Sequence, residues 1–194
     1  HIGSMADAVR AYGVLLALRN LGYKSELIVY SDDMDGLRKV PSGLPAWLNE
    51  YLAKPVSTIP DPNGKCHKSF ADHMAGSLLK GLQSIGIPYR FQSATDAYRK
   101  GAFSSQIDII LKNSVSLGRK IATLVGQEKF LQILPYFPTC KSCGRLYVGK
   151  AERYYTEEKK VPSSCGGSKT GNPDIQGCGH RGERDGRKPD GKLA

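Results

Sequence analysis

The chain has 194 residues, enough for one large domain or two small ones, and 40% of them are hydrophobic, enough for a real core. Its formal net charge of +10 favours an anionic partner such as RNA, DNA or nucleotide phosphate, with a merely basic soluble protein as the alternative. The odd number of cysteines, five, argues against a disulfide framework, and no apolar stretch reaches the roughly 18 residues of a membrane span. We therefore expect a cytoplasmic protein with bound metal, no signal peptide and no membrane partner.

The first predicted elements are a helix over residues 4–21 and a strand over residues 25–30. Apolar side chains recur along one face of the helix, and Gly22 stands where a helix would end. The strand is a short apolar run followed by an acidic loop, a pattern typical of a buried parallel strand. A helix that leads into a buried strand is the second half of a β-α-β unit, whose first strand would precede His1.

The next predicted elements are a short helix over 44–53, a longer helix over 68–84, a strand over 87–91, and helices over 95–100 and 104–125. This order predicts an α/β fold with a Rossmann-like, mostly parallel sheet flanked by helices. Composition changes after Leu134, because four of the five cysteines lie beyond it among many Gly, Lys and Arg residues. We therefore predict a boundary near residue 135, followed by a small module held together by metal.

The chain opens with His1-Ile2-Gly3-Ser4, at the start of the first predicted helix. A helix N-terminus offers free N–H groups and a positive dipole end to a phosphate, and a histidine can donate to a phosphate oxygen. Glycine lets the backbone approach a flat base, because it has no Cβ. The block therefore suits nucleotide binding, with a tag remnant over residues 1–5 as the alternative. Because the chain starts with His rather than Met, we expect a fragment, a processed product or an engineered start.

Three acidic residues, Asp32, Asp33 and Asp35, follow the first strand, with Arg38 and Lys39 after them. Ligands of open α/β sheets bind beyond the carboxyl ends of the strands. The carboxylates could take a substrate ammonium, a ribose hydroxyl or Mg²⁺, and the two basic residues could meet phosphates. A solvated turn that caps the strand is the structural alternative.

Asp61, Cys66, His67 and His73 fall within thirteen residues, which predicts one tetrahedral zinc site. Six residues of an α-helix turn through about 600°, so His67 and His73 would point about 120° apart on one helix. We therefore expect the helix to begin after His67, so that a loop aims three ligands at His73. An exposed His67 and a hydrogen-bonded His73 are the alternative.

Cys140 and Cys143 form a Cys-x-x-Cys-Gly knuckle, which predicts half of a structural zinc site. Cys165 and Cys178 are the predicted second pair, although thirteen residues separate them, and His180 could replace one of the two. A redox role for the Cys-x-x-Cys pair is less favoured, because no helix clearly follows it.

These blocks resemble class I lysyl-tRNA synthetase over essentially the whole chain. Residues 1–4 resemble that family's His-Ile-Gly signature, although Ser4 departs from the second His of the wider class. Residues 32–41, Asp-Asp-Met-Asp-Gly-Leu-Arg-Lys-Val-Pro, are very similar to its acidic block and are highly specific. Residues 59–73 resemble its first zinc site, residues 93–101 also match, and the cysteine-rich stretch corresponds to its second zinc module.

The resemblance implies an enzyme that joins lysine to ATP and then transfers lysine to the terminal ribose of its tRNA, with no DNA partner. By carry-over, His1 and Gly3 would be catalytic, and ATP with Mg²⁺ would be held by His1, Ile2, Gly3 and Ser4. One or two zinc ions would be structural. Residues 1–134 would form a partial ATP-binding catalytic domain with an inserted zinc loop at 61–73, and residues 135–194 a zinc-ribbon-like module leading back to the sheet.

The resemblance also implies missing parts. The family carries a strand and a Thr-Pro-Ser-Gly-like turn before the His-Ile-Gly block, and a Lys-Met-Ser-Lys-Ser-like motif and anticodon-binding helices after the region matched here. We therefore expect this chain alone not to form lysyl-adenylate at a normal rate. Another class I synthetase, such as one for cysteine or glutamate, and a non-catalytic zinc-dependent RNA-binding module are the alternatives.

Overall fold

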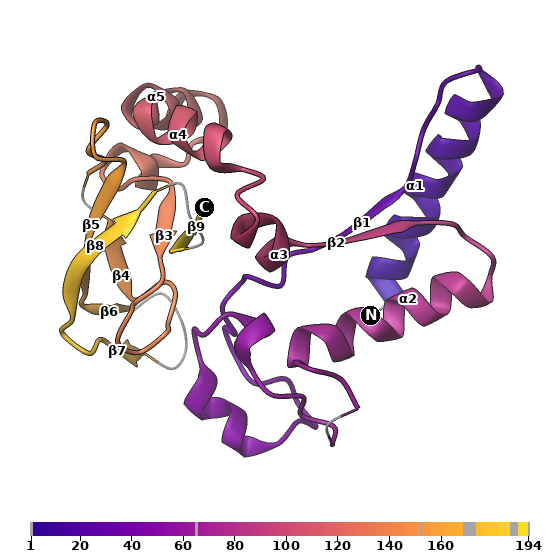
Figure 1. Ribbon diagram of the computed structural model, residues 1–194, viewed down its shortest axis with the longest axis horizontal. Helices are drawn as coiled ribbons and strands as arrows, with labels where there is room; N and C mark the ends of the chain where they lie inside the picture. The colour runs from indigo at the N-terminus through magenta and orange to yellow at the C-terminus, as the bar shows by residue number, and fades with distance from the viewer. Residues whose placement is uncertain (1, 65, 152, 169–173, 187–189, 194) are drawn as a thin grey trace.

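A computed structural model describes residues 2–64, 66–151, 153–168, 174–186 and 190–193, and Figure 1 shows their arrangement. Two helices, α1 (Ile2–Asn20) and α2 (Phe70–Ser84), lie beside a parallel pair of strands, β1 (Ile28–Ser31) and β2 (Arg90–Ser93). These four elements share a core that includes Leu15, Leu27 and Leu82. The parallel pairing of the two predicted strands is confirmed.

The segment between β1 and α2 carries two short 3-10 helices, η1 (Ala46–Tyr51) and η2 (Val56–Thr58). They pack on a second apolar cluster of Leu37, Leu48, Leu52, Ile59 and Phe70. The segment predicted as a short helix over 44–53 is thus a 3-10 helix, tighter than an α-turn and typical of short connecting pieces.

After β2 come α3 (Ala94–Arg99), α4 (Ser104–Lys112), α5 (Ser114–Val125) and the 3-10 turn η3 (Glu128–Leu131). The prediction of one helix over 104–125 was wrong, because the chain breaks at Asn113. The side-chain amide of Asn113 donates to the Ile109 carbonyl at 2.8 Å, a local bond through which asparagine competes with helix continuation.

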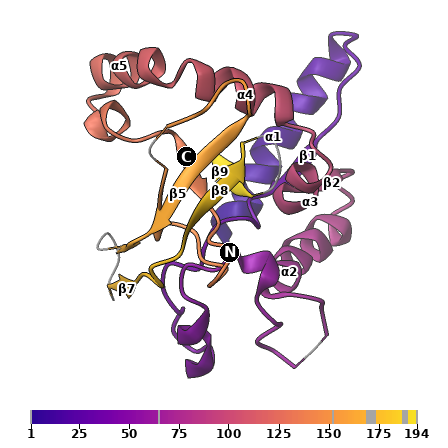
Figure 2. The same cartoon turned by 60° about the vertical axis from the view of Figure 1, so that its left-hand side comes forward.

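The C-terminal part is built from short antiparallel strands. The strands are β3 (Tyr136–Pro138), β4 (Gly149–Ala151), β5 (Lys160–Cys165), β6 (Gly167–Ser168), β7 (Ile175–Gln176), β8 (Arg181–Asp185) and β9 (Gly191–Leu193). They pair as β3 with β9, β6 with β7, and β4-β5-β8. Figure 2 shows β5 and β8 side by side, with α4 and α5 above them.

Two strand predictions need correction. The first strand is not buried, because the side chains of Ile28 and Tyr30 are 43% and 47% exposed. Within the described residues only β2 pairs with β1. Leu27 and the partly buried Val29 pack into the apolar core that α1 and α2 form. The second strand begins at Arg90 rather than at residue 87. Ile87 belongs to the turn after α2, because its N–H donates to the Leu82 carbonyl at 3.0 Å, and its side chain packs in the core.

Another apolar cluster spans the predicted boundary near residue 135. Met34, Tyr98 and Ile107 from the first part pack with Tyr136 and Val161 from the second. The helices and strands together make an α/β fold. The two-domain division, the zinc-ribbon-like module and the larger Rossmann-like sheet stay predictions.

None of the helices in the part of the chain that the structure describes is long and apolar enough to cross a membrane.

Candidate functional site

The four cysteines predicted as one metal site come together from three separate segments. Cys140 and Cys143 follow β3, Cys165 ends β5, and Cys178 follows β7. Their ligand atoms all lie within 4.8 Å of one another. The Sγ–Sγ distance is 3.5 Å between Cys140 and Cys178 and 3.9 Å between Cys143 and Cys165. Tetrahedral zinc with Zn–S bonds of about 2.3 Å places its sulfurs about 3.8 Å apart, so the donor set fits zinc.

Local backbone geometry brings these thiols together. The Gly144 N–H donates to the Cys140 carbonyl at 2.8 Å, and Gly144 has the positive φ (70°) that this tight turn requires. The Cys165 N–H donates to the carbonyl of His180 at 2.8 Å. His180 therefore contributes its backbone, and its side chain does not belong to the group of four ligands.

The electrostatics of the thiols also suit a cation. Burial raises the pKa of Cys165 to about 12 and raises the pKa of Cys143. The backbone N–H of His180 lowers the pKa of Cys178 to about 6. Several thiolates this close together would repel one another in the absence of a cation, and zinc both favours the thiolate form and neutralises its charge.

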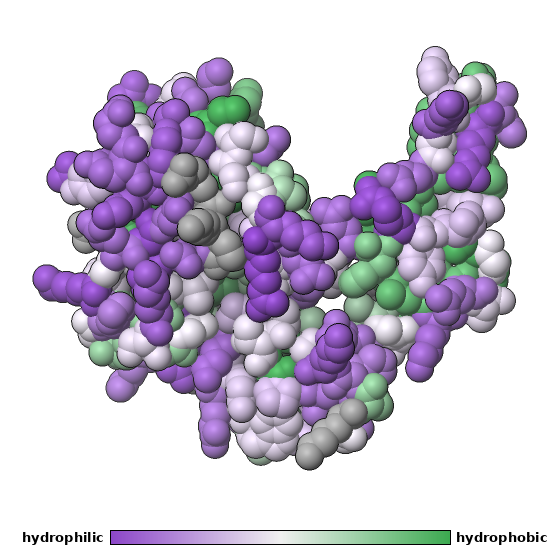
Figure 3. Space-filling view, in the orientation of Figure 1, coloured by the Kyte–Doolittle hydropathy of each residue, from purple (hydrophilic) through white to green (hydrophobic). Residues whose placement is uncertain are grey.

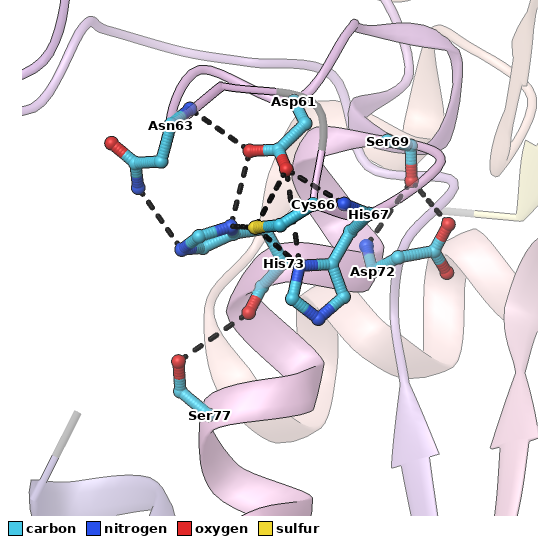
Figure 4. Close-up of polar contacts among 8 residues, drawn as sticks. All are labelled: Asp61, Asn63, Cys66, His67, Ser69, Asp72, His73 and Ser77. Carbon is cyan, nitrogen blue, oxygen red and sulfur yellow. Dashed lines mark hydrogen bonds and ion pairs between the residues drawn. The ribbon is translucent and has the colours of Figure 1, made fainter.

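The second predicted ligand set, Asp61, Cys66, His67 and His73, also converges, as Figure 4 shows. The Cys66 sulfur lies 3.0 Å from His67 Nδ1 and 3.3 Å from His73 Nδ1. Asp61 Oδ1 lies 3.0 Å from His73 Nδ1. Because helix α2 begins at Phe70, the prediction that it starts after His67 is confirmed. One sulfur, two imidazole nitrogens and a carboxylate oxygen form a set that zinc prefers.

Asp61 is held in place by hydrogen bonds from the backbone. Its side chain is buried, and it accepts backbone N–H bonds from Asn63 and His67, both at 2.9 Å. Burial opposes ionisation of Asp61, but these bonds and its contacts with Cys66 and His73 hold its pKa well below the usual range. The Asn63 side-chain amide lies 3.0 Å from His73 Nε2, so it orients the ring whose Nδ1 faces the cluster.

The predicted nucleotide block lies at the first turn of α1. His1 lies outside the described residues, whereas Ile2, Gly3 and Ser4 form the first residues of the helix. Gly3 is half-buried and Ser4 is exposed. The structure therefore places these backbone groups at a helix N-terminus, the position that the phosphate-binding prediction needs.

The three acidic residues after β1 have different surroundings. Asp33 is buried, and its carboxylate accepts from the Thr95 N–H at 2.7 Å and from the Ser93 hydroxyl. Asp32 is half exposed and pairs with Lys192. Asp35 pairs with Lys192 as well and accepts a hydrogen bond from the Tyr147 hydroxyl. The bonds of Asp33 join the end of β1 to the start of α3, so this carboxylate serves the fold.

Sequence reasoning missed two residues at this loop. The Tyr147 hydroxyl donates to Asp35 Oδ1 at 2.8 Å, and Lys192 Nζ contacts both Asp32 and Asp35. Arg38 lies over the Tyr147 ring, 5.6 Å from its centroid, and 3.8 Å from the Asp35 carboxylate. Tyr147 and Lys192 stand more than one hundred residues from the loop, and no local pattern marks them.

Residues 1–194 of the chain match the model of a protein family described as "tRNA synthetases class I (K)". The lysine–tRNA ligase of Cenarchaeum symbiosum is 52% identical over 194 residues, covering all of this chain and 37% of the relative. That of Archaeoglobus fulgidus is 30% identical over 193 residues, covering all of the chain and 36% of the relative. That of Rickettsia prowazekii is 33% identical over 157 residues, covering 79% of the chain and 30% of the relative.

Proposed function

The chain belongs to the class I tRNA synthetases of the lysine type, and from this premise we propose that it forms part of a lysine–tRNA ligase. The chain spans only 36–37% of the length of three relatives that match all of it. The observation that carries the proposal is the family match over residues 1–194, which includes the acidic loop and both ligand clusters.

The proposed reaction is attack of the lysine carboxylate on the α-phosphorus of ATP, with loss of pyrophosphate, followed by transfer of lysine to the terminal ribose of tRNA. Such chemistry depends mainly on positioning and on stabilising developing charge. His1 and Gly3 are the proposed catalytic groups, and the start of α1, with Ile2 and Ser4, is the proposed phosphate and adenine contact. Mg²⁺ would accompany ATP and neutralise part of its phosphate charge.

Two structural zinc ions are part of the proposal. One would be held by Asp61, Cys66, His67 and His73, and the other by Cys140, Cys143, Cys165 and Cys178. Each set supplies four protein ligands, which fills a tetrahedral shell and leaves no position for a catalytic water. The second set supports a zinc-ribbon-like module over residues 135–194.

The test is ATP–pyrophosphate exchange on the polypeptide that carries this sequence in its cell, with lysine, cysteine and glutamate offered separately. We expect exchange with lysine alone. Exchange with cysteine or glutamate instead would replace the proposal with another class I synthetase. RNA binding without exchange on any of the three would favour a non-catalytic RNA-binding module.

A row of polar residues on the outer face of the β4-β5-β8 sheet supports the RNA partner. Lys150 pairs with Ser164, and Ser164 pairs with Arg181, so the three side chains share one face. Lys150 and Arg181 are exposed. Hydrophilic side chains dominate the side of the molecule that carries this sheet, at the left of Figure 3. Two cations flanking a hydroxyl suit the phosphate backbone of RNA.

Replacing both cations, Lys150→Ala with Arg181→Ala, should weaken tRNA binding and reduce the slope of log K against log salt by about 2, because two fewer counterions are released. The measurement is a salt titration of binding by fluorescence anisotropy. Lys24→Ala with Lys80→Ala is the matched control, since both lysines are exposed and lie outside this sheet, Lys24 just after α1 and Lys80 in α2. An equal loss in the control would show that net charge, rather than this row, binds the RNA.

A further inference from the structure

Three consecutive residues that follow the first cysteine pair contact the segment behind the acidic loop. Arg145 Nε donates to the Leu52 carbonyl at 3.0 Å. The Leu146 N–H donates to the Ala53 carbonyl at 2.7 Å. The third residue is Tyr147, whose hydroxyl donates to Asp35 at 2.8 Å. The turn that presents two cysteines thus leads directly into contacts with residues 35–53.

Tyr147 joins the backbone and the side chains of the loop. Its hydroxyl also accepts from the Gly36 N–H at 3.3 Å, so one phenol holds two successive loop residues. A Cβ on Gly36 would meet the Tyr147 ring and the Ala53 carbonyl oxygen, both at 2.8 Å, so the ring and the loop backbone are closely fitted. Burial, followed by the hydrogen bond to Asp35, raises the pKa of Tyr147, so the hydroxyl keeps the proton that it donates.

Lys192 approaches the same loop from strand β9. Its side chain is only 13% exposed, and its ammonium contacts the carboxylates of Asp32 and Asp35. Strand β9 pairs with β3, the strand that leads into Cys140. Both donors to Asp35, the hydroxyl of Tyr147 and the ammonium of Lys192, therefore come from backbone that is tied to the cysteine cluster.

Ala53 links the loop segment to the cysteine cluster by packing. It is buried in one apolar cluster with Cys140, Cys165 and Val148. Its φ is 63°, a left-handed conformation that is unfavourable for a non-glycine residue and persists only where the surroundings impose it. Here the surroundings are the cysteine cluster and the Leu146 N–H, so the packing of the thiols helps to set the backbone next to Gly36.

We propose that the cysteine cluster, when it holds its metal, fixes the conformation of the acidic loop at residues 32–36, and that Tyr147 and Lys192 are the positioning residues that transmit this order. The role of this loop in ligand binding rests on the proposed function. The loop lies at the carboxyl end of β1, where an α/β sheet binds its ligands. The structural coupling itself needs neither ATP nor lysine.

The test is amide hydrogen exchange by NMR, without ATP or lysine, on the polypeptide that carries this sequence in its cell. Tyr147→Phe removes the hydroxyl but keeps the ring against Phe137, whose centroid lies 5.0 Å away. In the metal-loaded chain we expect the Gly36 amide to exchange about tenfold faster in this variant, as for a lost hydrogen bond, with the β2 amides unchanged. Chelating the metal should speed Gly36 exchange in the wild type and bring the wild type and Tyr147→Phe to the same rate, because the module then no longer holds the loop.

Tyr154→Phe is the matched control, because Tyr154 lies in the same module but donates to Asp108 of α4. Its Gly36 exchange should stay at the wild-type rate. The proposal fails if Tyr147→Phe leaves Gly36 within about twofold of the wild type, if Tyr154→Phe has the same effect, or if chelation leaves Gly36 unchanged. Since no substrate is present, such a failure would leave the ligase proposal standing, and absent exchange activity would leave this coupling standing.

Discussion

Removing metal from the cysteine cluster is expected to unfold the C-terminal module. The four thiols come from three separate segments, and Ala53 and Val148 are the only other fully buried members of their apolar cluster among the described residues. Structural zinc binds with an apparent free energy of about 10–16 kcal/mol, as large as the roughly 5–15 kcal/mol that stabilises a whole domain. Burial raises the pKa values of Cys143 and Cys165 and so disfavours their thiolate forms. Without the cation these thiols would lose the partner that stabilises the thiolates and holds the segments together.

The measurement is zinc per chain by elemental analysis together with thermal unfolding followed by circular dichroism. We expect two zinc ions per chain in protein purified without chelator. Cys165→Ser should lose one of them and lower the melting temperature of the module. Ser164→Ala is the control, because its side chain lies on the opposite face of β5 from Cys165. A chain without zinc that melts like the untreated protein would refute the structural role of this cluster.

Asp33→Ala is expected to destabilise the protein by about 3 kcal/mol, because it removes a buried carboxylate and leaves its donors without an acceptor. The donors are the Thr95 N–H, 2.7 Å from Oδ1, and the Ser93 hydroxyl. Ser93 is also the N-cap of α3 and accepts from the Asp96 N–H at 3.1 Å. Losing Asp33 therefore frees both the end of β1 and the start of α3. Urea unfolding would measure the change.

Asp32→Ala is the matched control for this prediction. Asp32 precedes Asp33 in the chain, but its side chain is 51% exposed and is ion-paired with Lys192. Exposed ion pairs contribute about 0–1 kcal/mol, so the loss should be much smaller. Equal destabilisation by the two substitutions would contradict the assignment of Asp33 to the fold and return it to the list of ligand candidates.

Features of short range could be predicted from the sequence. The start of α2 follows from the angle between two histidines on a helix, and the structure confirms it. Membership of the synthetase family was predicted from the acidic block and the His-Ile-Gly signature, and the comparisons confirm it. Where the prediction relied on periodicity alone it failed: the helix predicted over 104–125 is broken at Asn113 into α4 and α5, and a strand expected to be buried is half exposed.

The sequence by itself determined the chemistry that is available: which residues can bind zinc, where the acids follow a strand, and which family the chain belongs to. Only the tertiary structure decided what each acid does, because Asp32, Asp33 and Asp35 are alike in sequence but differ in burial and in partners. The partners of Asp35, Tyr147 and Lys192, stand 112 and 157 residues from it. Contacts over such separations depend on how the two parts of the chain pack, and neither helical nor strand periodicity carries that information.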